Sequence, residues 1–189
     1  MRIIAGELKG RKLERIDTEL IRPTSDRVRE ALFSILGDMV IDSRFLDLFA
    51  GSGSVGIEAF SRGAKEVVFV DAGNDSIKVL NSNLQKTNLI EETEIIQADY
   101  AATVEKLAYQ GRKFDIIFID PPYKFGIALD AVRKIQEKNL LSKNGVIIVE
   151  HGSKDLIPEK IGIFEIFKEK KYGNICLSLY VIKKKNGEI

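Results

Sequence analysis

The sequence predicts an α/β fold built on a doubly wound, mostly parallel sheet of seven strands. Apolar, strand-like runs alternate with segments of helical periodicity between residues 45 and 149, which is typical of a parallel sheet with crossover helices. Two later runs, 164–168 and 177–182, are separated by too few residues for a crossover helix, so they imply an antiparallel C-terminal edge. Two short runs around Gly6 and Gly10 predict a small N-terminal β-hairpin extension.

Composition indicates one globular unit. The chain has 189 residues, of which 44% are hydrophobic and 30% charged, enough for a substantial core. We divide it into a hairpin extension, residues 1–23, and a main domain, residues 24–189. No apolar run approaches the ~20 residues of a membrane span and no signal-type segment opens the chain, so we expect a cytoplasmic protein. The single cysteine, Cys176, is flanked by apolar residues and is predicted to be buried.

Basic residues gather in the predicted hairpin at Lys9, Arg11, Lys12 and Arg15. They fit an RNA-binding arm, and they equally fit a solvated edge hairpin that only holds the N-terminus in place. The formal net charge of +1 argues against a strong, non-specific nucleic-acid binder, so any basic binding surface must be local.

The first helix is expected to begin near Asp26. Pro23 blocks a helix before this point, and Thr24 or Ser25 can cap it. Apolar residues then recur at helical spacing and leave Arg27 on the outward side.

Five buried strands and four further helices follow in alternation. We expect the strands at 45–49, 67–70, 95–98, 114–119 and 146–149. The helices are expected after Gly53, at 74–87, at about 102–110 and at about 127–138, and Asn74 or Asp75 can cap the second of them.

A small-residue loop, Asp47-Leu48-Phe49-Ala50-Gly51-Ser52-Gly53, joins the first of these strands to its helix. Gly51 and Gly53 allow a sharp reversal and let a ligand approach the main chain closely. The spacing of Gly51, Gly53 and Gly56 also matches the dinucleotide-binding pattern, with Asp71 twenty positions after Gly51. This match alone is a weak signal.

Acidic residues at the strand ends are a stronger signal. Asp71, Asp99 and Asp120 each follow a strand, and Asp47 lies near the end of the first one. Because the carboxyl ends of parallel strands line the ligand crevice, these four carboxylates are predicted to converge. They would repel a diphosphate and attract a ligand with positive charge, ribose hydroxyls and an exocyclic amine. S-adenosylmethionine fits that description.

The fourth strand runs into Asp120-Pro121-Pro122-Tyr123. Two prolines remove two backbone donors and stiffen the loop, which then presents the Asp120 carboxylate and the Pro121 carbonyl as acceptors for an amine with two N–H groups. Tyr123 offers a flat face on which an extruded base could stack. In isolation, the prolines would merely end the strand and Tyr123 would pack in the core, but the other strand-end acids favour the functional interpretation.

These motifs resemble the S-adenosylmethionine-dependent amino-methyltransferases, and further motifs make the chain similar to bacterial RsmD-type methyltransferases, which modify guanine N2 in small-subunit ribosomal RNA. The family-specific stretches are Arg2-Ile3-Ile4-Ala5-Gly6, Arg22-Pro23-Thr24 and Asp26-Arg27-Val28-Arg29-Glu30, and the match is made closer by Ser61-Arg62-Gly63-Ala64, Val149-Glu150-His151 and Tyr172-Gly173. The resemblance spans nearly the whole chain.

The resemblance implies a Rossmann-like class I methyltransferase that transfers a methyl group in line to a flipped-out guanine. Asp47 and the loop Phe49, Ala50, Gly51 and Gly53 would hold the methionine end of the cofactor, Asp71 the ribose and Asp99 the adenine amine. Asp120, Pro121, Pro122 and Tyr123 would act on the base. The RNA would contact Lys9, Arg11, Lys12, Arg22 and Arg27. We expect a monomer that needs no metal ion and acts on ribosomal RNA, free or in a partly assembled subunit.

Three other functions stay open. An adenine-N6 DNA methyltransferase would carry the same loops, because the Asp-Pro-Pro-Tyr motif binds an amine without specifying the base. A nicotinamide-dependent oxidoreductase would use the glycine pattern, although Asp47 and Asp120 disfavour it. An inactive RNA-binding module would not need an intact Asp120 to Tyr123. His151, the only histidine, is expected to be structural rather than a base.

Overall fold

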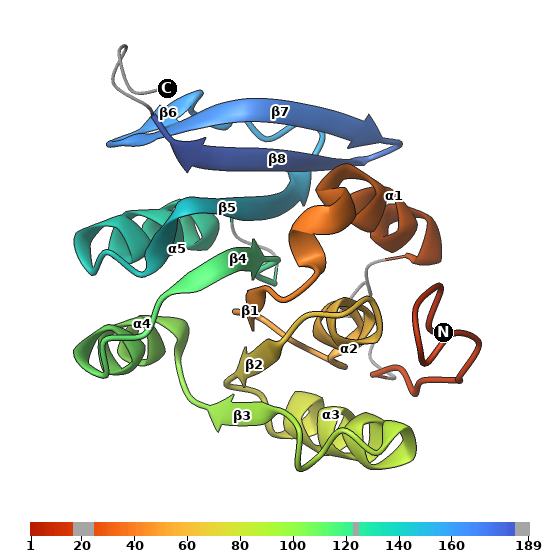
Figure 1. Ribbon diagram of the computed structural model, residues 1–189. Coiled ribbons are helices and arrows are strands. Elements are labelled where there is room, and N and C mark those ends of the chain that lie inside the picture. Colours follow the sequence, from red (N-terminus) through yellow and green to blue (C-terminus); the bar gives the residue numbers. More distant parts are fainter. Residues whose placement is uncertain (17–24, 123–124, 184–189) are drawn as a thin grey trace.

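The computed structural model describes residues 1–16, 25–122 and 125–183, and within them one eight-stranded sheet lies between two layers of helices (Figure 1). The strands are β1 (Arg44–Asp47), β2 (Glu66–Asp71), β3 (Glu94–Gln97), β4 (Phe114–Ile119), β5 (Leu141–Gly152), β6 (Lys160–Ile161), β7 (Phe164–Tyr172) and β8 (Ile175–Ile182). Their spatial order is β3-β2-β1-β4-β5-β8-β7-β6. The predicted α/β class is confirmed. The count exceeds the prediction by one, because β6 has only two residues and shows no periodicity.

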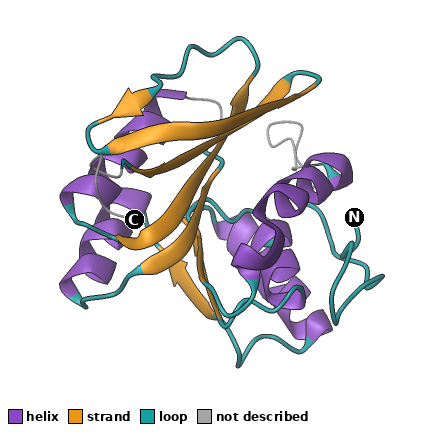
Figure 2. Cartoon of the chain, turned by 45° about the horizontal axis from the view of Figure 1, so that its top comes forward, coloured by secondary structure: helices purple, strands orange, loops and turns teal. Residues whose placement is uncertain are grey.

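Helices cover both faces of the sheet (Figure 2). They are α1 (Asp26–Leu36), the short 3-10 helix η1 (Gly37–Val40), α2 (Ser54–Ser61), α3 (Asn74–Thr87), α4 (Tyr100–Tyr109) and α5 (Phe125–Glu137). The first three α-helices pack on one face, and α4 and α5 pack on the other. The chain runs outward from β1 to β3 and then returns to β4 beside β1, so the strand order reverses between β1 and β4. Ligands of such sheets bind at this reversal.

Side-chain alternation along each strand feeds two separate cores. Phe45, Phe118 and Ile148 belong to the core beneath α1, α2 and α3. Their chain neighbours Leu46 and Ile117 belong to the core beneath α4 and α5. This alternation therefore also predicts toward which face of the sheet the side chain of a residue just beyond a strand end points.

The antiparallel edge consists of β8, β7 and β6. β8 inserts between β5 and β7 and pairs antiparallel with both strands, as the short connection at Tyr172-Gly173-Asn174 predicted. Cys176 on β8 is buried, as expected.

Helix starts show which capping predictions hold. The Ser25 hydroxyl accepts the Val28 N–H at 3.3 Å, so Ser25 caps α1 as predicted. The expected cap of α3 by Asn74 or Asp75 is wrong, because both lie inside the helix and Gly73 precedes it without a side-chain cap. The Asp71 carboxylate fixes this turn instead by accepting the Gly73 N–H at 2.8 Å. Among the described residues, no helix combines the length and apolar character needed to cross a bilayer.

The N-terminal residues 1–16 form two extended segments joined by a single antiparallel bridge between Arg2 and Lys12. This is the predicted hairpin in its shortest form. Ile3, Leu8 and Leu13 from this segment enter the same core as α1 and α2. The segment is therefore bound to the main domain by packing and does not project as a free arm.

A buried carboxylate on α2 holds the segment in place. Glu58 is fully buried and accepts the backbone N–H groups of Ile4 at 2.8 Å and Ala5 at 3.0 Å. It also accepts from Arg62 Nε at 2.8 Å and lies 3.6 Å from Arg29 Nε. Arg29 is itself fully buried, and burial lowers its pKa although Glu58 and Asp26 oppose that shift.

We expect Glu58→Ala to lower the free energy of unfolding by about 3 to 5 kcal/mol, because the buried Arg29 charge loses its buried partner. It should also expose the N-terminal segment to trypsin at Lys9 and Arg11. Urea denaturation and limited proteolysis measure both effects. Glu105→Ala on the exposed side of α4 is the control and should change stability by less than about 0.5 kcal/mol. Equal effects of the two changes would contradict the role of Glu58.

Candidate functional site

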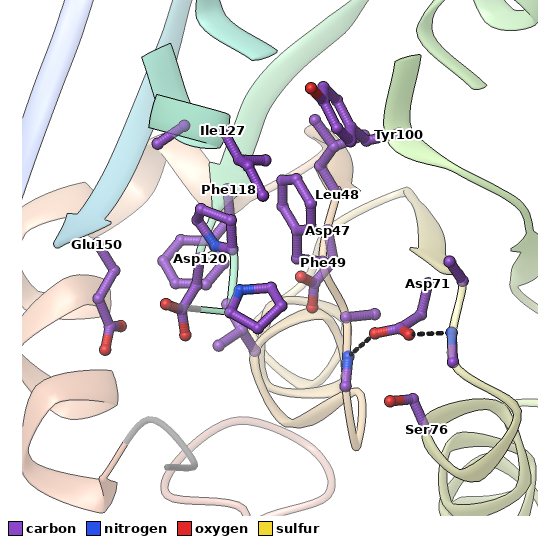
Figure 3. A pocket seen from close by; sticks show the side chains of 18 of the residues that line it. Asp47, Leu48, Phe49, Asp71, Ser76, Tyr100, Phe118, Asp120, Ile127 and Glu150 are labelled. Atoms are coloured by element: carbon purple, nitrogen blue, oxygen red, sulfur yellow. Dashed lines mark hydrogen bonds between the residues drawn. The ribbon is translucent and has the colours of Figure 1, made fainter. Parts of the chain in front are cut away.

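The carboxyl ends of β1, β2, β4 and β5 open into one crevice with a volume of about 680 Å³ (Figure 3). This volume lies in the range typical of small-molecule sites. Most of the predicted cofactor and catalytic residues line it, namely Asp47, Phe49, Ala50, Gly51, Asp71, Asp99, Asp120, Pro121 and Pro122. The strand-end acids therefore converge as the sequence predicted.

The glycine loop after β1 depends on two left-handed residues. Gly51 has φ +54° and lines the crevice. Gly53 has φ +79°, and a Cβ there would lie 2.3 Å from Leu80 Cδ1. Gly53 is not among the lining residues, so its visible role is to let α2 start against α3.

Asp71 is already oriented by the main chain. One of its oxygens accepts the Gly51 N–H at 2.8 Å and the other accepts the Gly73 N–H at 2.8 Å. These bonds fix the carboxylate at the mouth of the crevice, where the remaining lone pairs can accept from a ligand hydroxyl.

Asp99 and Tyr100 form the β3 side of the crevice. The Asp99 carboxylate caps α4 by accepting the Ala101 N–H at 2.8 Å. The Tyr100 ring lies against Phe49 with 5.3 Å between ring centroids, and its hydroxyl donates to Asp130 at 2.7 Å. Burial and the Asp130 carboxylate raise the pKa of Tyr100 to about 12. Two aromatic faces thus border this end.

Asp47 is an acid of the crevice with a strongly raised pKa. It is buried and accepts the Gly56 N–H at 3.0 Å. Burial is the largest cause that raises the pKa of Asp47, the Gly56 hydrogen bond opposes it, the charges of Asp120 and Asp71 add to it, and the net result is a pKa of about 7. A cation bound beside Asp47 would stabilise its charged form and so oppose the effects that raise its pKa.

The Asp120-Pro121-Pro122 loop leaves β4 at the centre of the crevice. Register pairs Asp47 with Phe118, two residues before Asp120, on the neighbouring parallel strand. Asp47 and Asp120 therefore point to the same face of the sheet. Tyr123 lies outside the described residues.

His151 lines the crevice, but its ring is engaged in the sheet. Its Nε2 lies 2.9 Å from the Ser178 hydroxyl, which donates to Glu169 at 2.9 Å. The arrangement agrees with the structural role expected for His151.

The predicted RNA-contacting residues do not share one environment. Lys9 and Arg27 line a second cavity of about 270 Å³, together with Arg2. The Arg11 guanidinium instead donates to the Thr87 carbonyl at 3.1 Å, which gives it a structural contact at the end of α3. Lys12 is exposed opposite Arg2, and Arg22 lies outside the described residues.

Sequence reasoning missed several lining residues, including Ser76, Tyr100, Ile127, Glu150 and Ile175. One of them carried a usable signal: Glu150 follows the apolar run of β5 in the same way that Asp120 follows that of β4. The others have no distinctive pattern in the sequence.

The arrangement favours a cationic ligand with hydroxyl and amine donors. Asp47, Asp71, Asp99 and Asp120 all offer acceptors, so they fit such a ligand and would repel a diphosphate. Within the described ranges, no group of three or more His, Cys, Asp or Glu side chains is arranged to hold a metal ion.

Comparisons with known proteins agree with this chemistry. Residues 1–181 match the family model described as Conserved hypothetical protein 95. Ribosomal RNA small subunit methyltransferase D of Haemophilus influenzae is 40% identical over 95% of this chain and 93% of its own length. The protein of the same name from Escherichia coli K12 is 32% identical over 95% of this chain and 89% of its own length. The solved structure of the Escherichia coli protein yhhF superposes with a TM-score of 0.84, at 30% identity over 98% of this chain and 99% of that chain.

We expect Asp47→Asn to stabilise the ligand-free protein at alkaline pH. The pKa of Asp47 rises to about 7 on folding, so the unfolded chain releases a proton that the folded protein retains. The Asp47 contribution to stability is therefore lost as the pH rises from about 4 to 7. The stability gain of the variant should grow by about 3 kcal/mol between pH 5 and pH 8.

Thermal unfolding at the two pH values measures this growth. Asp115→Asn is the control of opposite sign, because the hydrogen bonds from Arg44 lower the pKa of Asp115 to about 2 and the variant should lose stability at pH 8. A gain from Asp47→Asn that is the same at both pH values would exclude a buried, titrating Asp47.

Proposed function

The chain belongs to the family of ribosomal RNA small subunit methyltransferase D, and from this membership we propose that it methylates the exocyclic N2 amine of a guanine in small-subunit ribosomal RNA. S-adenosylmethionine is the methyl donor. The observation that carries the proposal is that one crevice combines the Asp120 and Pro121 acceptors with the strand-end carboxylates that suit this cofactor.

The cofactor supplies an electrophilic methyl group on a sulfonium when it is bound. On our proposal, Asp71 accepts from the ribose hydroxyls, Asp99 accepts from the adenine amine, and Asp47 with the loop from Phe49 to Gly51 holds the methionine end. The two backbone bonds to Asp71 support its part, because a fixed carboxylate needs no ordering when the ligand arrives. The raised pKa of Asp47 supports a cationic neighbour.

Asp120 and the Pro121 carbonyl would accept the two N–H bonds of the target amine. The lone pair of that nitrogen is delocalised into the ring, so the amine is a poor nucleophile until it becomes pyramidal. Two fixed acceptors favour the pyramidal geometry and aim the lone pair at the methyl group. Asp120 thus acts mainly by positioning, because the methylated nitrogen is acidic enough to lose its proton to water.

Labelled methyl transfer tests the proposal most directly. The protein is incubated with labelled cofactor and either small-subunit RNA or partly assembled subunits, and the product is digested to nucleosides. We expect N2-methylguanosine from at least one of the two substrates. N6-methyladenosine, or no transfer to either substrate, would contradict the proposal.

We expect Tyr123→Phe to keep most of the activity and Tyr123→Ala to lower kcat/KM roughly 5- to 150-fold, because stacking needs only the ring face. Asp120→Ala should be more severe than either change, since it leaves the amine unpaired in a desolvated site. Tyr109→Ala is the matched control, because that tyrosine is 95% exposed on α4 and should be dispensable. Single-turnover rates measure the effects, and inactivity of Tyr123→Phe would refute stacking.

The cavity beside α1, which Lys9 and Arg27 line together with Asp26 and Glu30, leads to a separate expectation. If Lys9 and Arg27 each contact a phosphate, the double change to alanine should weaken RNA binding and reduce the slope of log K against log salt by about 1.5 to 2. Filter binding at several salt concentrations measures the slope. Lys106→Ala with Lys138→Ala removes the same charge from the opposite face and should leave the slope unchanged. Equal slopes for both double variants would leave the N-terminal segment with a structural role only.

A further inference from the structure

Glu150 occupies the same place on β5 that Asp120 occupies after β4. The parallel register pairs Ile119 with Val149, so the next residues of the two strands, Asp120 and Glu150, are adjacent. Neighbouring strands lie about 4.8 Å apart. The target amine held at Asp120 would thus lie within reach of a second carboxylate.

Alternation directs both side chains to the same face. Phe118 and Ile148, two residues before Asp120 and Glu150, both belong to the core beneath α1, α2 and α3. Glu150 lines the crevice and is 8% exposed. In Figure 3 the Asp120 and Glu150 carboxylates point the same way, and Asp71 lies on the other side of Asp120. Glu150 therefore lies on the opposite side of Asp120 from the acids assigned to the cofactor. The proposed function leaves that side for the base.

A carboxylate at this position can distinguish purines. Next to its N2 amine, guanine carries a donor, the N1–H, on the Watson–Crick edge, whereas adenine carries a lone pair at N1. An ionised carboxylate only accepts hydrogen bonds, so it pairs with the N1–H of guanine and repels the N1 lone pair of adenine. A flipped base is read through this edge, and a buried site strengthens the discrimination.

We propose that Glu150 is the specificity-determining residue that accepts the N1–H of the target guanine. The inference rests on the proposed function, since it names how the same site recognises its base. Asp120 and Pro121 bind an amine on any base, whereas Glu150 restricts that base to guanine.

Base analogues in a synthetic RNA fragment test this role, with the target guanine located beforehand by the nucleoside assay. 2-Aminopurine keeps the N2 amine but has a lone pair at N1. The wild-type protein should favour guanine over 2-aminopurine by about 10- to 100-fold in kcat/KM. Glu150→Gln should narrow this preference at least about 10-fold, because an amide can donate to N1 as well as accept from it. Both analogues are compared in both proteins, so the missing O6 of 2-aminopurine cancels from the change in preference.

Two further variants give the experiment its controls. Glu150→Asp keeps an acceptor-only group and should retain the preference for guanine even if its rate falls. Glu105→Gln changes an exposed carboxylate on α4 that does not line the crevice, and should alter neither rate nor preference. Calorimetry with S-adenosylmethionine checks that each variant is folded.

The outcomes separate the two proposals. If the wild-type protein forms N2-methylguanosine but Glu150→Gln keeps the full preference, the role of Glu150 is overturned and the proposed function stands. If the wild-type protein forms no N2-methylguanosine, both are overturned. The assignment is supported if the preference for guanine narrows in Glu150→Gln but not in the two control variants.

Discussion

The convergence of carboxylates at one edge of a parallel sheet is the constraint on which the site depends. Parallel strands cannot end anywhere else than at the same edge, so the acids after β1, β2 and β4 share one crevice. Ionising Asp47 in this crevice has a cost, which the rise in its pKa to about 7 expresses: burial is the largest cause, and the charges of Asp120 and Asp71 add to it. A cationic ligand lowers that cost on binding, which makes the repulsion between the acids part of the selection for the cofactor.

A second buried carboxylate, Glu58, holds the N-terminal segment in place. Glu58 lies on the helix that begins at the glycine loop, and it binds the backbone of Ile4 and Ala5. The same helix end carries Ser61, whose hydroxyl donates to the Ala5 carbonyl at 2.6 Å. Helix α2 thus connects the loop at the crevice to the N-terminal segment with Lys9. If RNA contacts that segment as proposed, the contact would be held in a fixed position relative to the crevice.

The sequence was sufficient for those features that depend on local pattern. Strand-end acids, the Ser25 cap and the antiparallel edge follow from periodicity and turn chemistry, and the structure has all of them. Features that depend on tertiary contacts were not predictable. Glu58 is the only charged residue of α2, and nothing in the sequence signals that it is buried. β6 exists only as a partner of β7, and Gly53 serves packing against Leu80. Arg11, grouped with the RNA contacts by its charge, binds the Thr87 carbonyl.

The order of strands also explains why one crevice can perform two separate recognition tasks. β1, β2 and β3 end on one side of Asp120, and β5 ends on the other. On our proposal, the acids on the first side bind a ligand through its charge and hydroxyls, whereas a carboxylate on the second side binds the edge of a planar base. Asp120 lies between them, and on our proposal it belongs to both parts, because the amine that it holds is the part of the base that must face the methyl donor. If Glu150 selects the base as we propose, a change of base specificity in this fold would need a change at the end of β5 and could leave the cofactor side intact.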